Sequence, residues 1–123
     1  MGNQPYIVGV GAANLDLNGA SCAPLHLRDS NPGHISLSAG GVTRNVCENL
    51  ARLGADVKLL SCVGDDVFGS YIRRSCVEAG IDIRYLHEAK GAHSSIYLSI
   101  LDADGDMLVG MSDMRIVQQD LPA

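Results

Sequence analysis

The sequence predicts an α/β fold: a parallel β-sheet flanked by helices, with a smaller β-sheet attached. Short apolar runs alternate with two segments of helical periodicity, which is typical of parallel strands joined by crossover helices. Further strands alternate apolar and polar residues, so they need a second surface to cover. The length of 123 residues corresponds to about one domain.

The N-terminal elements follow from β-branched runs and glycine positions. Residues 6–10 (YIVGV) predict a buried strand, and residues 15–18 and 34–38 predict half-exposed strands. The segment 24–33 between them is rich in Pro, Asp, Asn and Gly, which indicates a loop. Gly40 and Gly41 end the last of these strands, and a helix follows over 43–53. The apolar face of this helix includes Val46 and Leu53, and Gly54 stops it.

The remaining elements continue the alternation. Residues 57–63 predict a second buried strand, and residues 68–79 a helix capped by the acidic residues before it. A strand is expected at 81–87. The runs 94–101 and 107–111 flank an Asp-Gly loop, which is a hairpin signal. The polar tail 112–123 predicts no further element.

Composition excludes several classes of protein. Nine basic against 14 acidic residues give a net charge of −5, which argues against a nucleic-acid partner. No apolar run reaches the roughly 20 residues that span a bilayer, and the polar residues 1–5 do not resemble a signal peptide. The four cysteines lack zinc spacing, so reduced, mostly buried thiols and a cytoplasmic location are expected.

The first candidate site is the Gly40-Gly41 pair with Thr43 and Asn45 behind it. Glycines allow a ligand to approach the backbone, and the first amide groups of a helix lack partners within it. Asn45 offers both a donor and an acceptor. The alternative is a tight strand-to-helix turn with no ligand.

The second candidate site is the pair Asn14 and Asp16, just beyond the first buried strand. Open α/β sheets bind ligands at the carboxyl ends of their strands. In an extended segment both side chains project to the same side, and together they can clamp vicinal hydroxyl groups. The alternative is an Asx-type turn at the surface.

Other motifs favour structural roles. Gly9 and Gly11 hint at a dinucleotide fingerprint, but the third small residue is missing and no helix is expected next. Asp65 and Asp66 are interpreted as a helix cap. The acidic cluster 102–106 lacks the final Glu of a calcium loop, so no metal site is predicted.

The glycines at 40, 41, 54 and 64, together with Asn45, have the spacing of a known signature. This pattern resembles the N-terminal signature of ribokinase-like (PfkB) sugar and nucleoside kinases. Two positions depart from it: Thr43 stands where a small Gly, Ala or Pro is usual, and Cys47 stands where Ser, Thr or Ala is usual. The larger Thr43 would narrow the substrate pocket. Segments 29–33, 94–102, 107–109 and 112–114 are similar to bacterial pseudouridine kinases within that family.

The resemblance covers nearly the whole chain and implies an activity. It implies ATP-dependent phosphorylation of a ribosyl primary hydroxyl, with pseudouridine or a related ribosyl molecule as substrate and pseudouridine 5′-phosphate as product. ATP and Mg²⁺ would serve the full-length enzyme. The implied fold is the N-terminal part of a ribokinase-like parallel sheet flanked by helices, with a small β-sheet lid.

The resemblance also implies roles for individual residues. The sugar site would be lined by Asn14, Asp16, Gly40, Gly41, Thr43 and Asn45. The lid would comprise strands at about 15–38 and 83–111, and its residues would be Asp29, Ser30, Asn31, Ser94, Ser95 and Tyr97. Lid strands would pair between two copies of the chain in a homodimer.

The family's catalytic base, anion hole and ATP-binding region lie in the C-terminal half, and their motifs do not occur in residues 1–123. We therefore expect the base and anion hole beyond Ala123. The chain alone is expected to bind neither ATP nor Mg²⁺ and to have negligible kinase activity. Two alternatives stay open: a non-catalytic ribosyl-binding or dimerisation module, and a kinase for another sugar or nucleoside.

Overall fold

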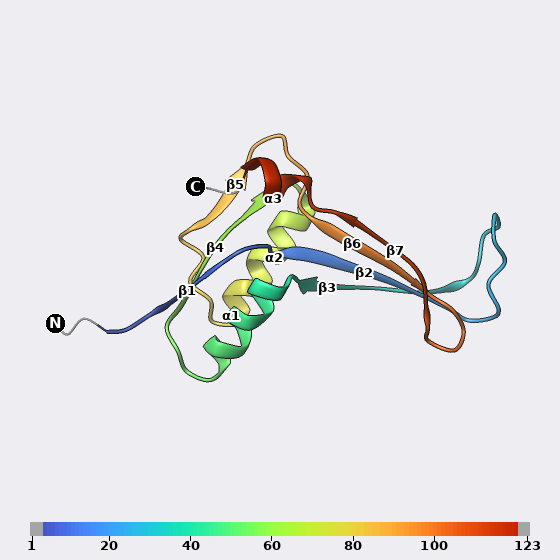
Figure 1. Ribbon diagram of the computed structural model, residues 1–123, viewed down its shortest axis with the longest axis horizontal. Coiled ribbons are helices and arrows are strands. Elements are labelled where there is room, and N and C mark those ends of the chain that lie inside the picture. Colours follow the sequence, from blue (N-terminus) through green and yellow to red (C-terminus); the bar gives the residue numbers. More distant parts are fainter. Residues whose placement is uncertain (1–3, 121–123) are drawn as a thin grey trace.

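Two β-sheets organise the computed structural model, which describes residues 4–120 (Figure 1). The first is a parallel sheet in the order β1-β4-β5. The second is a mixed sheet in the order β3-β2-β6-β7. The strands are β1 (Ile7–Val10), β2 (Asn14–Ser21), β3 (Gly33–Gly40), β4 (Val57–Gly64), β5 (Leu86–Ala89), β6 (Ile96–Leu101) and β7 (Met107–Asp113).

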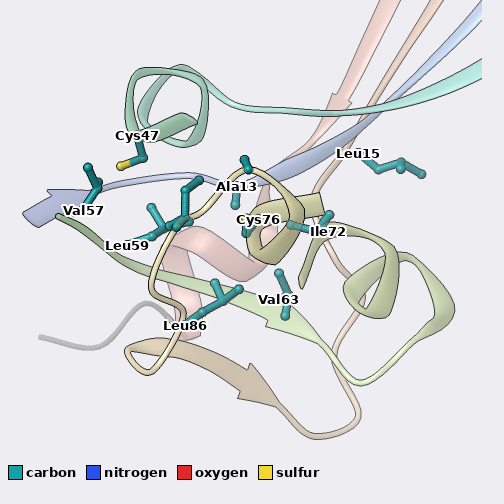
Figure 2. Close-up of a cluster of buried hydrophobic side chains, with 11 residues drawn as sticks. Ala13, Leu15, Cys47, Val57, Leu59, Val63, Ile72, Cys76 and Leu86 are labelled. Atoms are coloured by element: carbon teal, nitrogen blue, oxygen red, sulfur yellow. The ribbon is translucent and has the colours of Figure 1, made fainter. Parts of the chain in front are cut away.

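The parallel sheet and the helices α1 (Val42–Arg52), α2 (Val67–Glu78) and α3 (Arg115–Asp120) form what we call the body. Its main core is aliphatic, as expected for a chain with no Trp and one Phe. Figure 2 shows side chains from both sheets and both longer helices meeting there, among them Leu15, Leu59 and Ile72. The predicted α/β class is therefore confirmed.

The mixed sheet, which we call the arm, reaches away from the helices (Figure 1). Its two central strands, β2 and β6, are parallel, and each outer strand is antiparallel to its neighbour. Most side chains of β3 and β7 are exposed. Hydrogen-bonded pairing in register, more than apolar burial, holds this part of the molecule together.

All four strands of the arm attach to the body at one end. Asn14 pairs with Gly40, Leu15 with Ile96, and Ile96 with Asp113. We call this row of positions the root of the arm. The opposite end carries the loop from Cys22 to Pro32 and the β6–β7 turn (Figure 1).

Several expectations about local structure are wrong. The strand at 6–10 is expected to be buried, but Ile7, Val8 and Val10 of β1 are all exposed. Residues 81–85 form no regular strand: Asp82 makes an isolated bridge with Lys58, and β5 begins only at Leu86. β5 also pairs with β4 in the body, so the range 83–111 is not entirely part of the arm. The polar tail contains α3, because Ile116 is buried beside Cys62 and Ala89. Residues 121–123 of that tail, like residues 1–3, lie outside the described residues.

The two longer helices largely match expectation. On α1, Cys47 is buried as expected, but Val46 and Leu53 are exposed, so the buried stripe is narrower than predicted. Cys47, Cys62 and Cys76 are buried and Cys22 is exposed. None of the helices within residues 4–120 is long and apolar enough to cross a membrane.

Candidate functional site

A hollow of about 400 Å³ lies where the root of the arm meets the start of α1. It collects residues from β2, α1 and β6 that are far apart in sequence. Its lining residues are Ala12, Asn14, Asp16, Gly41, Val42, Thr43, Asn45, Tyr97 and Met114. The structure thus brings both candidate sites of the sequence into a single place.

Asn14 and Asp16 form a hydrogen-bonded pair on one face of β2. Asn14 Nδ2 donates to Asp16 Oδ1 over 2.8 Å, and Asn14 itself is buried. Burial raises the pKa of Asp16 above its ordinary value, against the lowering effect of the Asn14 hydrogen bond. The strand geometry explains the shared face, since residues two apart project to the same side. No Asx turn is present, because both residues lie within β2.

Gly40 and Gly41 are required by the crowding around that pair. A Cβ atom on Gly40 would collide with the Asp16 carboxylate. Gly41 has a φ of 100°, and its Cβ would lie 2.5 Å from the carbonyl oxygen of Ala12 and 2.8 Å from Asn14 Oδ1. Both glycines therefore allow the backbone to pass directly beside the polar pair. Gly40 itself does not line the hollow, but it lies against the Asp16 carboxylate, which does.

α1 begins at Val42 beside the hollow, with Gly41 as its N-cap residue, and no described side chain caps its first turn. Its first amide groups are available to a ligand, and they carry the positive end of the helix dipole. Thr43 lies in that first turn and approaches the carbonyl oxygen of Val10 at 3.5 Å. The Asn45 side chain is exposed at the hollow, and its Oδ1 accepts a hydrogen bond from Arg44 Nη1 at 3.2 Å.

Tyr97 and Met114 also line the hollow. Tyr97 pairs in register with Asp16, so the two side chains share one face of the arm. The Tyr97 hydroxyl reaches over Gly110 to Met107 Sδ, 3.4 Å away. Met114, Val42 and Ala12 were not predicted as site residues. Only the position of Met114 directly after β7 hinted at a place near the root.

The predicted lid residues Ser94 and Ser95 are buried below the root and do not line the hollow. Ser94 Oγ accepts from the Gly64 amide at 2.9 Å and donates to Asp66 Oδ1 at 2.7 Å. The Ser95 carbonyl accepts from the Leu15 amide at 2.9 Å. Both residues therefore fix the start of β6 to the body.

The remaining predicted lid residues lie at the far end of the arm. Asn31 Oδ1 accepts from the His26 amide at 2.8 Å, and Asp29 Oδ1 accepts from the Ser30 amide at 2.8 Å. Asn31 lines a separate hollow of about 380 Å³ there. The structure does not bring Asp29, Ser30 or Asn31 to the hollow at the root.

The other sequence motifs have structural explanations. A Cβ on Gly9 would collide with Cys47 Sγ and one on Gly11 with Thr43 Oγ1, so these glycines let α1 pack closely on β1. A strand, β2, follows them in place of the helix a dinucleotide site needs. Asp66 caps α2 through the Gly69 amide at 2.8 Å, as predicted.

The groups that line the hollow have the chemistry that a polyol ligand requires. A carboxylate, an amide and open helix amides suit the hydroxyl groups of a sugar. Within residues 4–120, no three His, Cys, Asp or Glu side chains gather closely enough to hold a metal ion.

Comparison with known proteins agrees with this geometry. Residues 4–122 match the model of the pfkB family carbohydrate kinases. Pseudouridine kinase of Escherichia coli K12 is 41% identical over 116 residues, which cover 94% of this chain and 37% of that protein. The chain thus spans little more than a third of that relative's length.

Solved structures extend the likeness to the fold. A carbohydrate kinase from Agrobacterium tumefaciens superposes with a TM-score of 0.81 at 27% identity, over 92% of this chain and 36% of that one. A fructokinase from Xylella fastidiosa with bound ATP gives a TM-score of 0.73 at 25% identity, over 89% and 33%. The ribokinase-like fold expected from the sequence is confirmed, and the chain belongs to the pfkB family of carbohydrate kinases.

Proposed function

We propose that this chain is the substrate-binding and lid portion of a cytoplasmic, ATP-dependent nucleoside kinase that converts pseudouridine to pseudouridine 5′-phosphate. One observation carries the proposal: the hydrogen-bonded Asn14–Asp16 pair faces the uncapped start of α1 across a hollow of about 400 Å³. The identity of 41% to a pseudouridine kinase supports this substrate.

The proposed division of labour follows from the side chains. The Asp16 carboxylate accepts hydrogen bonds from two adjacent ribose hydroxyls, while Asn14 holds it in place. The first amides of α1 and the Asn45 side chain donate to the same sugar. The arm covers the substrate and excludes water, which protects phosphoryl transfer from hydrolysis.

Kinases of this family use ATP, and we assign ATP, Mg²⁺, the catalytic base and the anion hole to sequence outside residues 1–123. ATP supplies the phosphoryl group, with Mg²⁺ neutralising its phosphates. The chain by itself binds neither and transfers no phosphate. Phosphorylation of pseudouridine by the purified 123-residue chain would contradict this assignment.

The edges of the arm favour a dimer as well. β3 and β7 are its outer strands, and they expose Ile35 and Met111 by 76% and 68%. Unpaired edges of this kind invite another strand. We propose that a second copy of the chain pairs there, which sedimentation of the purified chain tests directly: a monomer at all concentrations would contradict it. A dimer that binds no ribosyl compound would favour the non-catalytic module.

Asp16→Ala tests the binding site. Loss of a charged hydrogen bond costs about 1.5–3 kcal/mol, so the affinity for pseudouridine should fall about 10- to 100-fold. Calorimetric titration with pseudouridine, uridine, ribose and fructose measures it. Asp104→Ala, in the exposed turn at the far end of the arm, is the matched control and should bind like the original chain.

Each outcome of this titration decides something. Equal affinity of the Asp16→Ala and original chains would remove Asp16 from the site. Stronger binding of fructose or ribose than of pseudouridine would replace the nucleoside by a sugar as substrate. Binding of none of the four compounds would overturn the proposed function.

A further inference from the structure

Arg44 is a buried cation in the first turn of α1, next to the hollow but outside its lining. Only 4% of its surface is exposed. Its guanidinium reaches three side chains: Nη2 contacts Glu48 Oε1 at 2.7 Å and Ser75 Oγ, and Nη1 donates to Asn45 Oδ1 at 3.2 Å. Asn45 is the one partner of the three that lines the hollow.

The chemistry of the guanidinium determines which way the Asn45 amide faces. Arginine has hydrogen-bond donors only, so the atom of Asn45 beside Nη1 must be the oxygen. The Nδ2 group of Asn45, with its two donors, is then left for the hollow. We propose that Arg44 is a positioning residue that presents Asn45 Nδ2 to a ribose hydroxyl of the substrate; this rests on the proposed function.

The other contacts of Arg44 anchor it to the body and not to the arm. Ser75 belongs to α2, and Glu48 lies one turn further along α1. Hydrogen bonding from Arg52, with a smaller contribution from Arg44, keeps the pKa of Glu48 below its ordinary value, so its carboxylate stays charged beside the guanidinium. The direction of the Asn45 amide is therefore set by contacts within α1 and α2, independently of the arm.

A packing role alone does not account for this residue. Burying a cation costs solvation, and well-packed apolar residues often replace buried ion pairs without loss of stability. Arg44 Nε is also buried with no hydrogen-bond partner among the described residues. Nη1 and Nη2 together contact three specific side chains while Nε has no partner among the described residues, which favours a role for the direction of Nη1 over simple packing.

A double-mutant cycle measures the coupling between Arg44 and Asn45. Asn45→Ala should weaken pseudouridine binding about tenfold, and Arg44→Met several-fold. The double variant should bind no more weakly than Asn45→Ala alone, because Arg44 acts through Asn45. Arg52→Met is the control: it removes another Arg–Glu48 pair on the same helix and should leave the affinity within about twofold. Independent, multiplying losses in the double variant would overturn the inference.

Arg44→Lys covers the case in which Arg44→Met fails to fold. Its ammonium keeps the charge beside Glu48 but cannot reach all three partners at once. We expect a melting temperature near that of the original chain together with the weaker binding of Arg44→Met. Full affinity in Arg44→Lys would show that charge alone suffices and would overturn the positioning role.

A measurement on the free chain separates this inference from the proposed function. NMR relaxation of the Asn45 Nδ2 group should report an ordered amide in the original chain and in Arg52→Met. In Arg44→Lys that amide should be mobile. An amide equally ordered in Arg44→Lys overturns the inference even if pseudouridine binds. If no nucleoside binds but the amide is ordered only with Arg44 present, the proposed function fails and the positioning of Asn45 by Arg44 stands.

Discussion

The body and the arm are held together in different ways. In the body, residues such as Leu59, Val63 and Ile72 have no exposed surface, and helices pack against the parallel sheet. In the arm, side chains of comparable size, such as Ile35 and Val109, are at least half exposed. The body is thus stabilised by apolar burial, and the arm by strand pairing extended from the body.

This difference explains why the candidate site lies between the two. The body supplies fixed groups, namely the start of α1 and the Arg44 cluster. The arm supplies Asn14, Asp16 and Tyr97 near its root, where burial still restrains them. A β-sheet without a core of its own is suited to move relative to the body while the residues at its root keep their positions.

The largest expected effect is on the free energy of unfolding, when a leucine is replaced by alanine in the body and, for comparison, in the arm. Leu59→Ala in the body should lower the free energy of unfolding by about 2–5 kcal/mol, because Leu59 is fully buried. Leu108→Ala on β7, where the side chain is 52% exposed, should cost less than about 1 kcal/mol. Urea denaturation of both variants measures this. Equal losses would mean that the arm is covered in solution, as in a dimer, and would abolish the distinction.

The next effect concerns the join between the regions. Asp66 accepts from the Gly69 amide, the Ser94 amide and the Ser94 hydroxyl, so it caps α2 and holds the start of β6. Burial raises its pKa, but these hydrogen bonds outweigh that effect and bring the pKa below its ordinary value. Asp66→Ala should cost about 1–3 kcal/mol, since it removes a cap and leaves a buried amide unpaired.

Hydrogen exchange locates that loss. In Asp66→Ala, amides of β6 should exchange faster than those of β4, because the arm loosens before the body does. Asp65→Ala is the control, since the bond that Asp65 accepts from the Gly91 amide is exposed. Faster exchange spread evenly over β4 and β6 would contradict the view of Asp66 as the join.

The smallest effects are pH-dependent and involve one carboxylate in each region. Hydrogen bonds from Arg84 hold the pKa of Asp82, in the body, well below its ordinary value. Arg115 lowers the pKa of Asp113, at the root of the arm, to about 2. A lowered folded-state pKa stabilises the fold above the unfolded value of 3.8, and the gain is lost as the pH falls toward the folded value.

Asp82→Asn and Asp113→Asn should therefore melt at lower temperature than the original chain near neutral pH. The difference in melting temperature between Asp113→Asn and the original chain, which we call the gap, should disappear as the pH falls from 3.8 to about 2. The gap for Asp82→Asn should close only at still lower pH, because its pKa is depressed further. Melting curves over this range measure both, and a gap that is independent of pH would show that neither ion pair contributes.

Much of the fold could be predicted because local signals agree with it. Gly40 and Gly41 mark the start of α1, and their absence of side chains is the feature that the site needs. The Asp-Gly turn marks the β6–β7 hairpin, where Asp102 Oδ1 accepts from the amides of Asp104 and Asp106. These signals act within a few residues, so sequence reveals them directly.

What could not be predicted depends on distant contacts. α3 forms because Ile116 finds a buried place against β4, and nothing in the tail announces it. Ser94 and Ser95 look like members of an exposed strand, yet the Gly64–Asp66 turn draws Ser94 into the interior. Met114 reaches the hollow only through the pairing of β6 with β7.

The alignment of the four strand ends at the root has a mechanical consequence. β2 and β3 are eight residues long, which at about 3.3 Å per residue places the tip of the arm about 26 Å from the root. A rotation of about 10° at the root would carry the tip by about 4–5 Å over that length. Asn14 and Asp16 lie close to the axis of such a rotation, and the tip lies far from it. A fluorophore on Cys22, the exposed cysteine near the tip, would therefore move much further than the residues at the hollow and would report small rotations at the root.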